Sequence, residues 1–419
     1  MREEISRHQN DASQLENLYR ANRSQFRRAF QELFPQTGNN TLLDYWRIRL
    51  NYDTSDINKG SASELLFVLV AALIAGCVAR LPMLLPIQEE IFYSRNLGFI
   101  IFPALSAYYA WKNKLPGSKL LFLVLCTLGA AVFINYLPKG ESDVIILSCI
   151  HLPLFLWSVL AFAFSPGKSS TVSDRLGFLK YNGDLLVISA LLIIAGIILS
   201  AITLGLFSVI GIDIAEWYFK NVVVFVAPAV PIVGTYLIRN NPRLVGRVSP
   251  VIARIFGPLV FVMLLVYLVA MVYSGSDPYN DREFLIVFNA LLIGVMAIIF
   301  FSLAESAGAT RSRVETWLLL ALAIVTVAVN CIALSAILFR ISEWGFTPNR
   351  TAVMGGNILM LIHLLLVTVK FFRNLPQIKT EKGFYGNAAV AETMAWYLPV
   401  YFVWSIVVTF LFPAIFGFN

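Results

Sequence analysis

The sequence has little charge. Only 14% of its 419 residues are Asp, Glu, Lys or Arg, whereas 58% are hydrophobic and the mean hydropathy is +0.73. Soluble domains are closer to one quarter charged and one half apolar. This balance excludes an ordinary soluble fold. It predicts an all-α, polytopic membrane protein, because apolar runs of 18 or more residues can cross a bilayer.

The motifs of soluble-type catalysis are also missing. The chain has no His-Glu-x-x-His, no Gly-x-Ser-x-Gly and no Gly-x-x-x-x-Gly-Lys motif. Its four cysteines all fall in apolar runs, where thiols act as small hydrophobic side chains. Only two histidines lie in the apolar region, and catalytic zinc takes three protein ligands. We therefore predict no metal and no cofactor, and an enzyme is the less favoured class.

Eleven apolar segments are candidate spans. They cover residues 64–85, 96–112, 118–137, 143–164, 183–210, 217–239, 248–273, 283–304, 314–339, 351–372 and 394–417. Residues 1–62, which precede the first candidate span, contain no apolar run. This predicts that the chain has no cleaved signal peptide. We expect two parts, a small helical cap over residues 1–62 and a transmembrane helical domain over residues 63–419.

The loop charges predict the orientation of these spans. Loops on the same side as the N-terminus hold fifteen basic residues: Lys112, Lys114, Lys119, Lys168, Arg175, Lys180, Arg239, Arg243, Arg247, Arg311, Arg313, Lys370, Arg373, Lys379 and Lys382. The opposite loops hold five: Arg95, Lys139, Arg282, Arg340 and Arg350. Basic loops stay in the cytoplasm. We expect a bacterial inner-membrane protein with its N-terminus inside, and a reporter fused after Asn419 should face outside.

The segment 96–112 is the weakest of the eleven candidates. It is short, it contains Pro103, and a re-entrant segment is the alternative to a full span. Without it every later loop would change sides, and the charge asymmetry would be lost. We therefore keep it as a span.

The cap has the pattern of two amphipathic helices. Ser13 followed by Glu16 predicts a capping box, and the helix would end at Pro35. Its apolar positions recur at helical spacing: Leu15, Leu18, Tyr19, Phe26, Phe30 and Leu33. The cap would lie on the inner membrane face, in contact with membrane lipids, or pack on cytoplasmic loops. The alternative is a cytoplasmic partner for residues 13–50. Nucleic acid is not expected, because residues 1–59 hold nine basic and eight acidic residues.

The outside loop "RISEWGFTPNRT", residues 340–351, has two interpretations. In the structural one, Trp344 and Phe346 belong to the interfacial aromatic belt and Arg340 pairs with Glu343. In the functional one, the loop is a lid or a clamp on an anionic group. Its candidate contacts are Glu343, Trp344, Thr347 and Arg350.

Two histidines lie near mid-membrane, where polar groups are costly. Neutral His151 and His363 would satisfy hydrogen bonds between helices or contact a substrate. Three places suggest interrupted helices that line a cavity. These are Pro228, Pro231 and Gly234; Gly257-Pro258; and Gly355-Gly356-Asn357. We predict a substrate cavity near these positions, with Asn357 among its polar groups.

An acidic pair offers an alternative site. Glu89 and Glu90 follow "ARLPMLLP" in the first outside loop and resemble the acidic pair of multi-span, lipid-linked sugar transferases. A carboxylate there could act as a general base on an acceptor. The loop is only about ten residues long, shorter than in those enzymes. A solvated acidic turn is the simpler interpretation.

Several phrases carry a family resemblance. They are the turn "WGFTPNR", the N-terminal "LENLYRANRSQFRRAFQELFP" and "LLDYWRIRLNY", and "EEIFYSRNLGFIIFP". With these the chain resembles a bacterial family of multi-span membrane proteins, with members in the Bacteroidetes, that is classified as a domain of unknown function. Thr351 stands where such members carry a tyrosine. The resemblance implies the architecture and no activity or cofactor.

Three functions remain open at this point. The leading one is binding or transport of a small or lipidic substrate, with Arg350 as an outer anion contact. The second is a lipid-linked transferase that uses Glu89 and Glu90. The third is a non-catalytic sensor or assembly scaffold whose working part is the cap.

Overall fold

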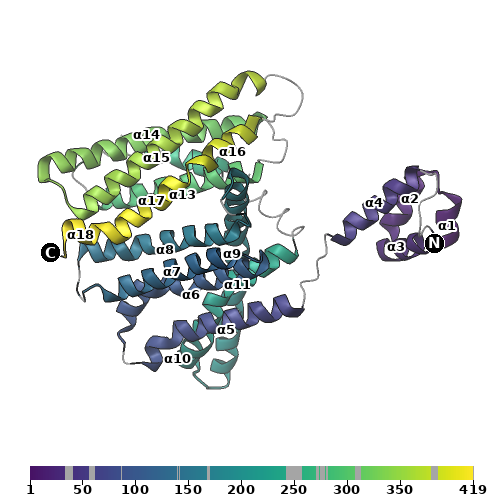
Figure 1. Cartoon of the computed structure of the whole chain (residues 1–419), viewed down its shortest axis with the longest axis horizontal. Helices are drawn as coiled ribbons and strands as arrows, with labels where there is room; N and C mark the ends of the chain where they lie inside the picture. The colour runs from purple at the N-terminus through teal and green to yellow at the C-terminus, as the bar shows by residue number, and fades with distance from the viewer. Residues whose placement is uncertain are drawn as a thin grey trace.

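The computed structural model describes the chain apart from residues 34–40, 56–61, 86, 139, 141, 168–169, 242–256, 270–272, 274–278, 280–281, 307–312, 379–385 and 419. The described residues form helices and no strand. Figure 1 shows two helical parts, a small one at the N-terminus and a large bundle. The predicted all-α membrane architecture is confirmed.

The cap contains four helices rather than two. They are α1 (Arg2–Arg7), α2 (Ala12–Ala21), α3 (Arg23–Leu33) and α4 (Thr41–Ser55). The apolar stripe that the sequence shows is used inside the cap, because its members pack against one another and against α4. The buried core consists of Ile5, Leu15, Tyr19, Phe26, Ala29, Phe30, Leu43, Trp46 and Leu50.

Two details of the predicted cap are wrong. The N-cap of α2 is Asp11, whose carboxylate accepts from the backbone N–H of Ser13 and of Gln14, so Ser13 does not form the capping box. The predicted single helix is broken at Asn22, which is extended at φ −154° and ψ 91°. The Asn22 side chain accepts from the backbone N–H of Gln25, as an N-cap does, and starts a new helix.

The bundle follows the predicted spans. Its elements are α5 (Ala62–Leu84), α6 (Glu89–Lys112), α7 (Gly117–Tyr136), α8 (Asp143–Phe164), α9 (Val172–Val209), α10 (Ala215–Tyr218), η1 (Phe219–Val223), α11 (Val224–Asn240), the helix Gly257–Val269, α13 (Arg282–Ser306), α14 (Arg313–Trp344), α15 (Pro348–Ile378), α16 (Gly386–Tyr397), α17 (Pro399–Ile406), η2 (Val407–Leu411) and α18 (Phe412–Phe416). Among described residues, nine helices are long and apolar enough to cross a membrane. The predicted segment 96–112 belongs to α6, which is one helix through Pro103 and, at 24 residues, about 36 Å long.

The bundle has two hydrophobic cores. The first is built mainly by α5, α6, α7 and α8, and the second by α13, α14, α15 and α16. Helix α9 contacts both cores, with Tyr181 in the first and Leu179 in the second. We call the end of the bundle at which α5 begins the N-proximal end, and the end that holds the C-terminus the C-proximal end (Figure 1).

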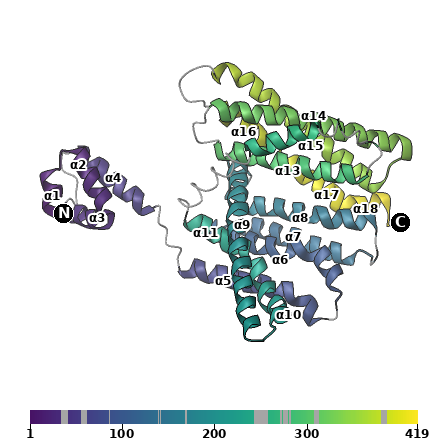
Figure 2. The ribbon, with the colours of Figure 1, turned by 180° about the vertical axis from the view of Figure 1, so that it is seen from behind.

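Helix α9 differs from the other long helices in direction and burial. Figures 1 and 2 show it crossing α8 and α13 at a steep angle. Only 6% of its most apolar stretch is buried, against 50% for α8. A helix that is apolar all round and uncovered by protein faces lipid. The first turns of α9 are therefore the part that packs on the bundle, and they form one wall of the site described next.

Candidate functional site

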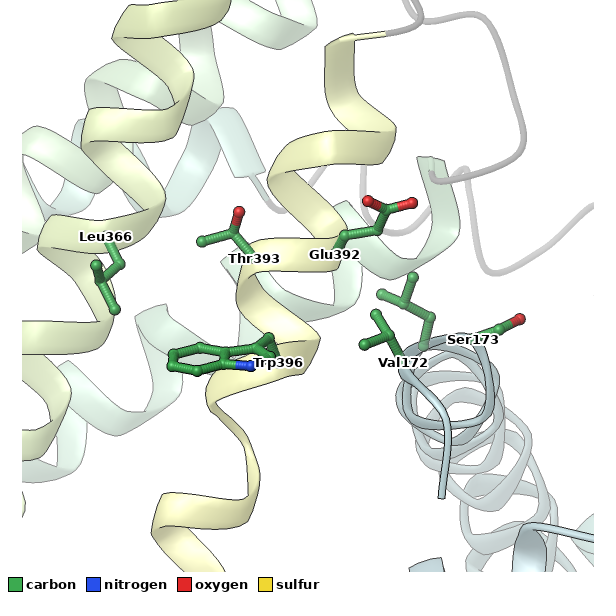
Figure 3. A pocket seen from close by; sticks show the side chains of 7 residues that line it. Val172, Ser173, Leu366, Glu392, Thr393 and Trp396 are labelled. Atoms are coloured by element: carbon green, nitrogen blue, oxygen red, sulfur yellow. The ribbon is translucent and has the colours of Figure 1, made fainter. Parts of the chain in front are cut away.

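A groove of about 530 Å³ lies between α9, α15 and α16, and it is open on one side. Its lining residues are Val172, Ser173, Leu176, Leu366, Glu392, Thr393 and Trp396. Figure 3 shows Glu392 and Thr393 on α16, with the Trp396 ring one turn further along the same helix. Ligand sites of small molecules usually measure roughly 300–1,000 Å³, so this volume suits a small ligand.

Beside the groove the last span is interrupted. Helix α16 ends at Tyr397 and α17 begins at Pro399. Proline has no N–H to donate to the carbonyl four residues earlier, that of Ala395. The guanidinium of Arg175 on α9 donates to the carbonyls of Ala395 and Trp396, at 3.3 Å each. Backbone carbonyls that the break sets free are thus satisfied from α9, across the groove.

His363 on α15 contacts the residues on both sides of this break. Its Nε2 lies 3.1 Å from the Met394 carbonyl and its Nδ1 lies 3.1 Å from the Tyr401 hydroxyl. A carbonyl only accepts, so Nε2 carries the proton and Nδ1 accepts from Tyr401. The ring is fully buried and lies between Phe300 and Tyr397, with centroids 4.5 and 4.6 Å away. His363 therefore makes the interhelical hydrogen bonds of its structural interpretation and positions α16.

The other predicted central residues lie elsewhere. His151 on α8 is half-buried, and its Nδ1 lies 2.9 Å from the Leu147 carbonyl of the same helix. Asn357 on α15 is buried, and its carbonyl accepts from the Asn330 side chain on α14 at 3.2 Å. Neither residue lines the groove. The structure does not bring His151, His363 and Asn357 together around this groove.

Arg350, in the loop predicted to lie outside, is bound by its own loop. Its Nη1 donates to the carbonyls of Trp344 and Gly345, at 2.8 Å each, where α14 ends. The Thr347 hydroxyl accepts from the backbone N–H of Arg350, at 3.3 Å, and caps the start of α15. Gly345 has φ +76°, which glycine adopts without strain. These contacts give Arg350 and Thr347 a role in shaping the turn.

Arg340 and Glu343 complete the loop. The Nε of Arg340 donates to the Tyr279 carbonyl at 2.8 Å, and its guanidinium lies 5.7 Å from the centre of the Trp344 ring. Trp344 also lies under Arg350, at 5.6 Å, and is half exposed. Glu343 is exposed. One tryptophan thus receives two cation–π contacts, which stabilise the turn.

The acidic pair of the alternative site opens α6. Glu89 and Glu90 are exposed residues in its first turn, where the helix dipole favours carboxylates. They lie at the C-proximal end of the bundle, and they do not line the groove. This placement agrees with the solvated-turn interpretation.

The predicted helix interruptions are wrong where the structure describes them. Helix α11 continues through Pro228 and Pro231, and α15 continues through the Gly355-Gly356-Asn357 segment. Gly355 serves close packing, because a Cβ there would lie 2.1 Å from Trp404. The interruption next to the groove is at Pro399, inside what the sequence showed as one apolar run.

The sequence analysis did not single out three residues that line the groove, Glu392, Thr393 and Trp396, or Arg175 beside it. Arg175 was counted only as a loop charge, and Glu392 lies outside the predicted span 394–417 because α16 starts earlier, at Gly386. The signal that could have found them is the proline in "AWYLPVYF". In the described part of the chain no three His, Cys, Asp or Glu side chains come close enough to hold a metal ion.

Comparison with known proteins finds no similar one. No family model, no curated protein and no solved structure matches the chain.

Proposed function

We propose that this chain is an integral membrane protein that binds a small amphiphilic, lipidic molecule in the groove between α9, α15 and α16. The observation that carries the proposal is the groove itself, which is open on one side and polar toward one end. A lipid-facing opening admits ligands from the membrane rather than from water.

The polarity of the groove suits an amphiphile. Ser173, Glu392 and Thr393 supply its polar groups, and Leu176, Leu366 and Trp396 supply apolar surface. Trp396 and Leu366 are 64% and 38% exposed, so their faces are free to contact a ligand. An amphiphile bound with its head at Glu392 and its tail along Trp396 would contact both the polar and the apolar surface of the groove. Both contacts favour binding.

The interrupted helix supports a binding role. Irregular backbone at membrane depth is tolerated where it is buried in protein or lines a cavity, often a binding site. Here the freed carbonyls of Ala395 and Trp396 lie next to the groove and are held by Arg175. With the N-terminus in the cytoplasm, as the loop charges predict, the groove would open to the inner leaflet.

Binding is better supported than the two alternatives. A transferase that uses Glu89 and Glu90 would place its site at the other end of the bundle, where these residues are exposed in a first helical turn. A scaffold acting through the cap would give no reason for the groove. Transport would extend the same proposal, since it begins with binding at this site.

The test fills the groove with larger side chains. In a Leu366→Trp/Thr393→Trp variant of the full chain, retention of co-purified amphiphile should weaken about tenfold, or ~1.4 kcal/mol, because the indoles occupy the binding volume. Native mass spectrometry from nanodiscs measures the bound molecule directly.

Leu338→Trp is the matched control, because Leu338 is a 47% exposed leucine on α14 that does not line the groove. It should retain ligand like the unaltered chain. Equal retention in the double variant would contradict the proposal. Loss in the control alone would point to a surface on α14 instead.

A further inference from the structure

We propose, resting on the function above, that the groove selects an amphiphile whose head carries a protonated primary amine, with the Glu392 carboxylate as its counter-ion. Four observations support this choice: the charge of the residues that line the groove, the engagement of the nearest cation on α9, the hydrogen bonds that Glu392 can accept, and the depth of Glu392 along α16.

Glu392 is the single charged residue among those that line the groove. Its side chain is exposed, and no hydrogen bond or ion pair joins it to any other residue that the structure describes. It lies inside the apolar stretch Ala388–Phe416. A carboxylate within a span is costly, and a bound cation offsets that cost.

The nearest described cation on α9 is already engaged. Arg175 uses Nη1 for the carbonyls of Ala395 and Trp396 and Nη2 for the Ser170 carbonyl, at 3.1 Å. The other groove residues of α9 and α15 are neutral: Val172, Ser173, Leu176 and Leu366. The bonds of Arg175 to neutral carbonyls leave it positively charged, but Arg175 does not line the groove. Among the lining residues Glu392 carries the only charge, so the groove lining favours a cationic head over an anionic one.

Hydrogen bonding favours a primary amine over a quaternary one. An ammonium group donates hydrogen bonds, and the Glu392 carboxylate in the groove can accept them. A quaternary ammonium donates none and is recognised by several aromatic rings, whereas this groove has one, Trp396.

The depth of Glu392 matches a lipid head. Glu392 is four residues beyond Ala388, where the apolar stretch begins, which corresponds to about 6 Å along the helix. Trp396 and Leu366 then offer apolar surface for an acyl chain. The acyl chain of an amphiphile would contact that surface, whereas a soluble amine would not, so we commit to an amphiphile.

The experiment uses the full chain in nanodiscs of equal phosphatidylethanolamine and phosphatidylcholine. Native mass spectrometry should show retained phosphatidylethanolamine in preference to phosphatidylcholine. Glu392→Gln should reduce this preference about tenfold (~1.4 kcal/mol). Glu343→Gln, which alters an exposed carboxylate of the outside loop, should keep the preference.

The outcomes separate this inference from the proposed function. Bound amphiphile without a preference for the primary amine, or with a preference for phosphatidylglycerol, overturns the amine inference and leaves the binding function standing. Displacement of the lipid by free ethanolamine overturns the amphiphile in favour of a soluble amine. Absence of any bound amphiphile in the unaltered chain overturns both proposals.

Discussion

The two halves of the bundle differ in the chemistry that joins their helices. In the half built on α5 to α8, buried charged side chains connect neighbouring helices. In the half built on α13 to α17, the contacts that join α15 to α16 and α17 around the interrupted helix are neutral, although Lys180 of α9 pairs with Glu305 of α13 at 3.2 Å. The groove belongs to the second half.

Glu64 illustrates the charged contacts. It is 2% exposed and accepts from the Tyr108 hydroxyl at 2.6 Å and from the Lys112 ammonium at 2.8 Å. Buried ion pairs are costly to break, because removing one partner leaves the other charge uncompensated. This contact fixes α5 against α6 at the N-proximal end.

Arg95 and Lys119 connect their own helices to the chain segments that follow α7 and α8. Arg95 is 6% exposed, and its guanidinium donates to three backbone carbonyls at the end of α7: Ile134 at 3.2 Å, Leu137 at 2.9 Å and Pro138 at 2.6 Å. Lys119 is 5% exposed and donates to the Ser165 and Gly167 carbonyls after α8. Cations thus bind the last carbonyls of helices, which stabilises their ends.

The second half uses neutral groups instead. His363 connects α15 to α16 and α17, and Asn330 connects α14 to α15. Neutral hydrogen bonds within membranes contribute only about 0.6 kcal/mol on average. The comparison teaches that the groove lies where neutral hydrogen bonds, rather than buried charges, join α15 to α16 and α17.

The largest expected effect breaks a charged contact. Arg95→Leu removes three charge-assisted hydrogen bonds and leaves buried carbonyls unsatisfied, so the free energy of unfolding should fall by about 3 kcal/mol. Chemical unfolding of the full chain in detergent measures it. Arg80→Leu is the control, because Arg80 is half-buried and contacts the Phe225 ring at 6.0 Å. An equal loss of unfolding free energy in the two variants would show that the buried contacts of Arg95 carry no special stabilisation.

The next effect tests packing in the second half. In Gly355→Ala the new Cβ would lie 2.1 Å from the Trp404 ring, so α15 and α17 must separate, at a cost of about 2 kcal/mol. Gly356→Ala meets nothing within 4 Å and should instead be neutral or slightly stabilising. Thermal unfolding of the two variants compares them directly. Similar melting temperatures would show that Trp404 moves freely.

A smaller effect tests the neutral contacts. His363→Phe keeps a ring but removes the bonds to the Met394 carbonyl and the Tyr401 hydroxyl, so unfolding free energy should fall by roughly 1–2 kcal/mol. Amphiphile retention should weaken with it, since α16 loses a support. His151→Phe breaks only a bond within α8 and should change neither quantity. If His151→Phe lowered the unfolding free energy or the retention more than His363→Phe, then His151 rather than His363 would be the residue that supports the site.

The smallest effect concerns the exposed ion pairs of the cap. The hydrogen bond from Arg20, helped by Arg49, lowers the pKa of Glu16 below its usual 4.5, although burial opposes the shift. The stabilisation is therefore present above pH 4.5 and is lost as the pH falls through the lowered pKa. Hydrogen exchange of cap amides, corrected for intrinsic rates, should reveal this acid sensitivity. Glu16→Gln should abolish it.

Much of the architecture could be predicted from the sequence. The described part of each predicted span is helical, because a helix is the form in which an apolar segment satisfies its own backbone inside a membrane. Eleven spans were predicted, whereas nine helices of the described residues are long and apolar enough to cross a membrane; α6 is not among them, and residues 248–256 and 270–272 lie outside the described residues. Helix ends were less predictable. Asp11 rather than Ser13 caps α2, and α16 begins before the predicted span, since local hydrogen bonds and tertiary contacts decide the last turn.

The candidate site could not be predicted in the same way. His363 was recognisable as a costly polar group, but its partners Met394 and Tyr401 lie more than thirty residues away in sequence. Arg350 suggested an anion contact, yet its guanidinium binds the carbonyls of Trp344 and Gly345. Which group a polar side chain satisfies depends on three-dimensional neighbours that periodicity does not specify.

The sequence by itself determined that the chain is a membrane-spanning helical bundle with a small helical cap, because hydrophobicity and segment length act locally. Only the tertiary structure decided where the helices leave a groove. The break at Pro399, the steep course of α9 and the reach of Arg175 across to α16 together form it. A groove arises from the packing of elements far apart in the chain, and that packing depends on the shapes of all their side chains together.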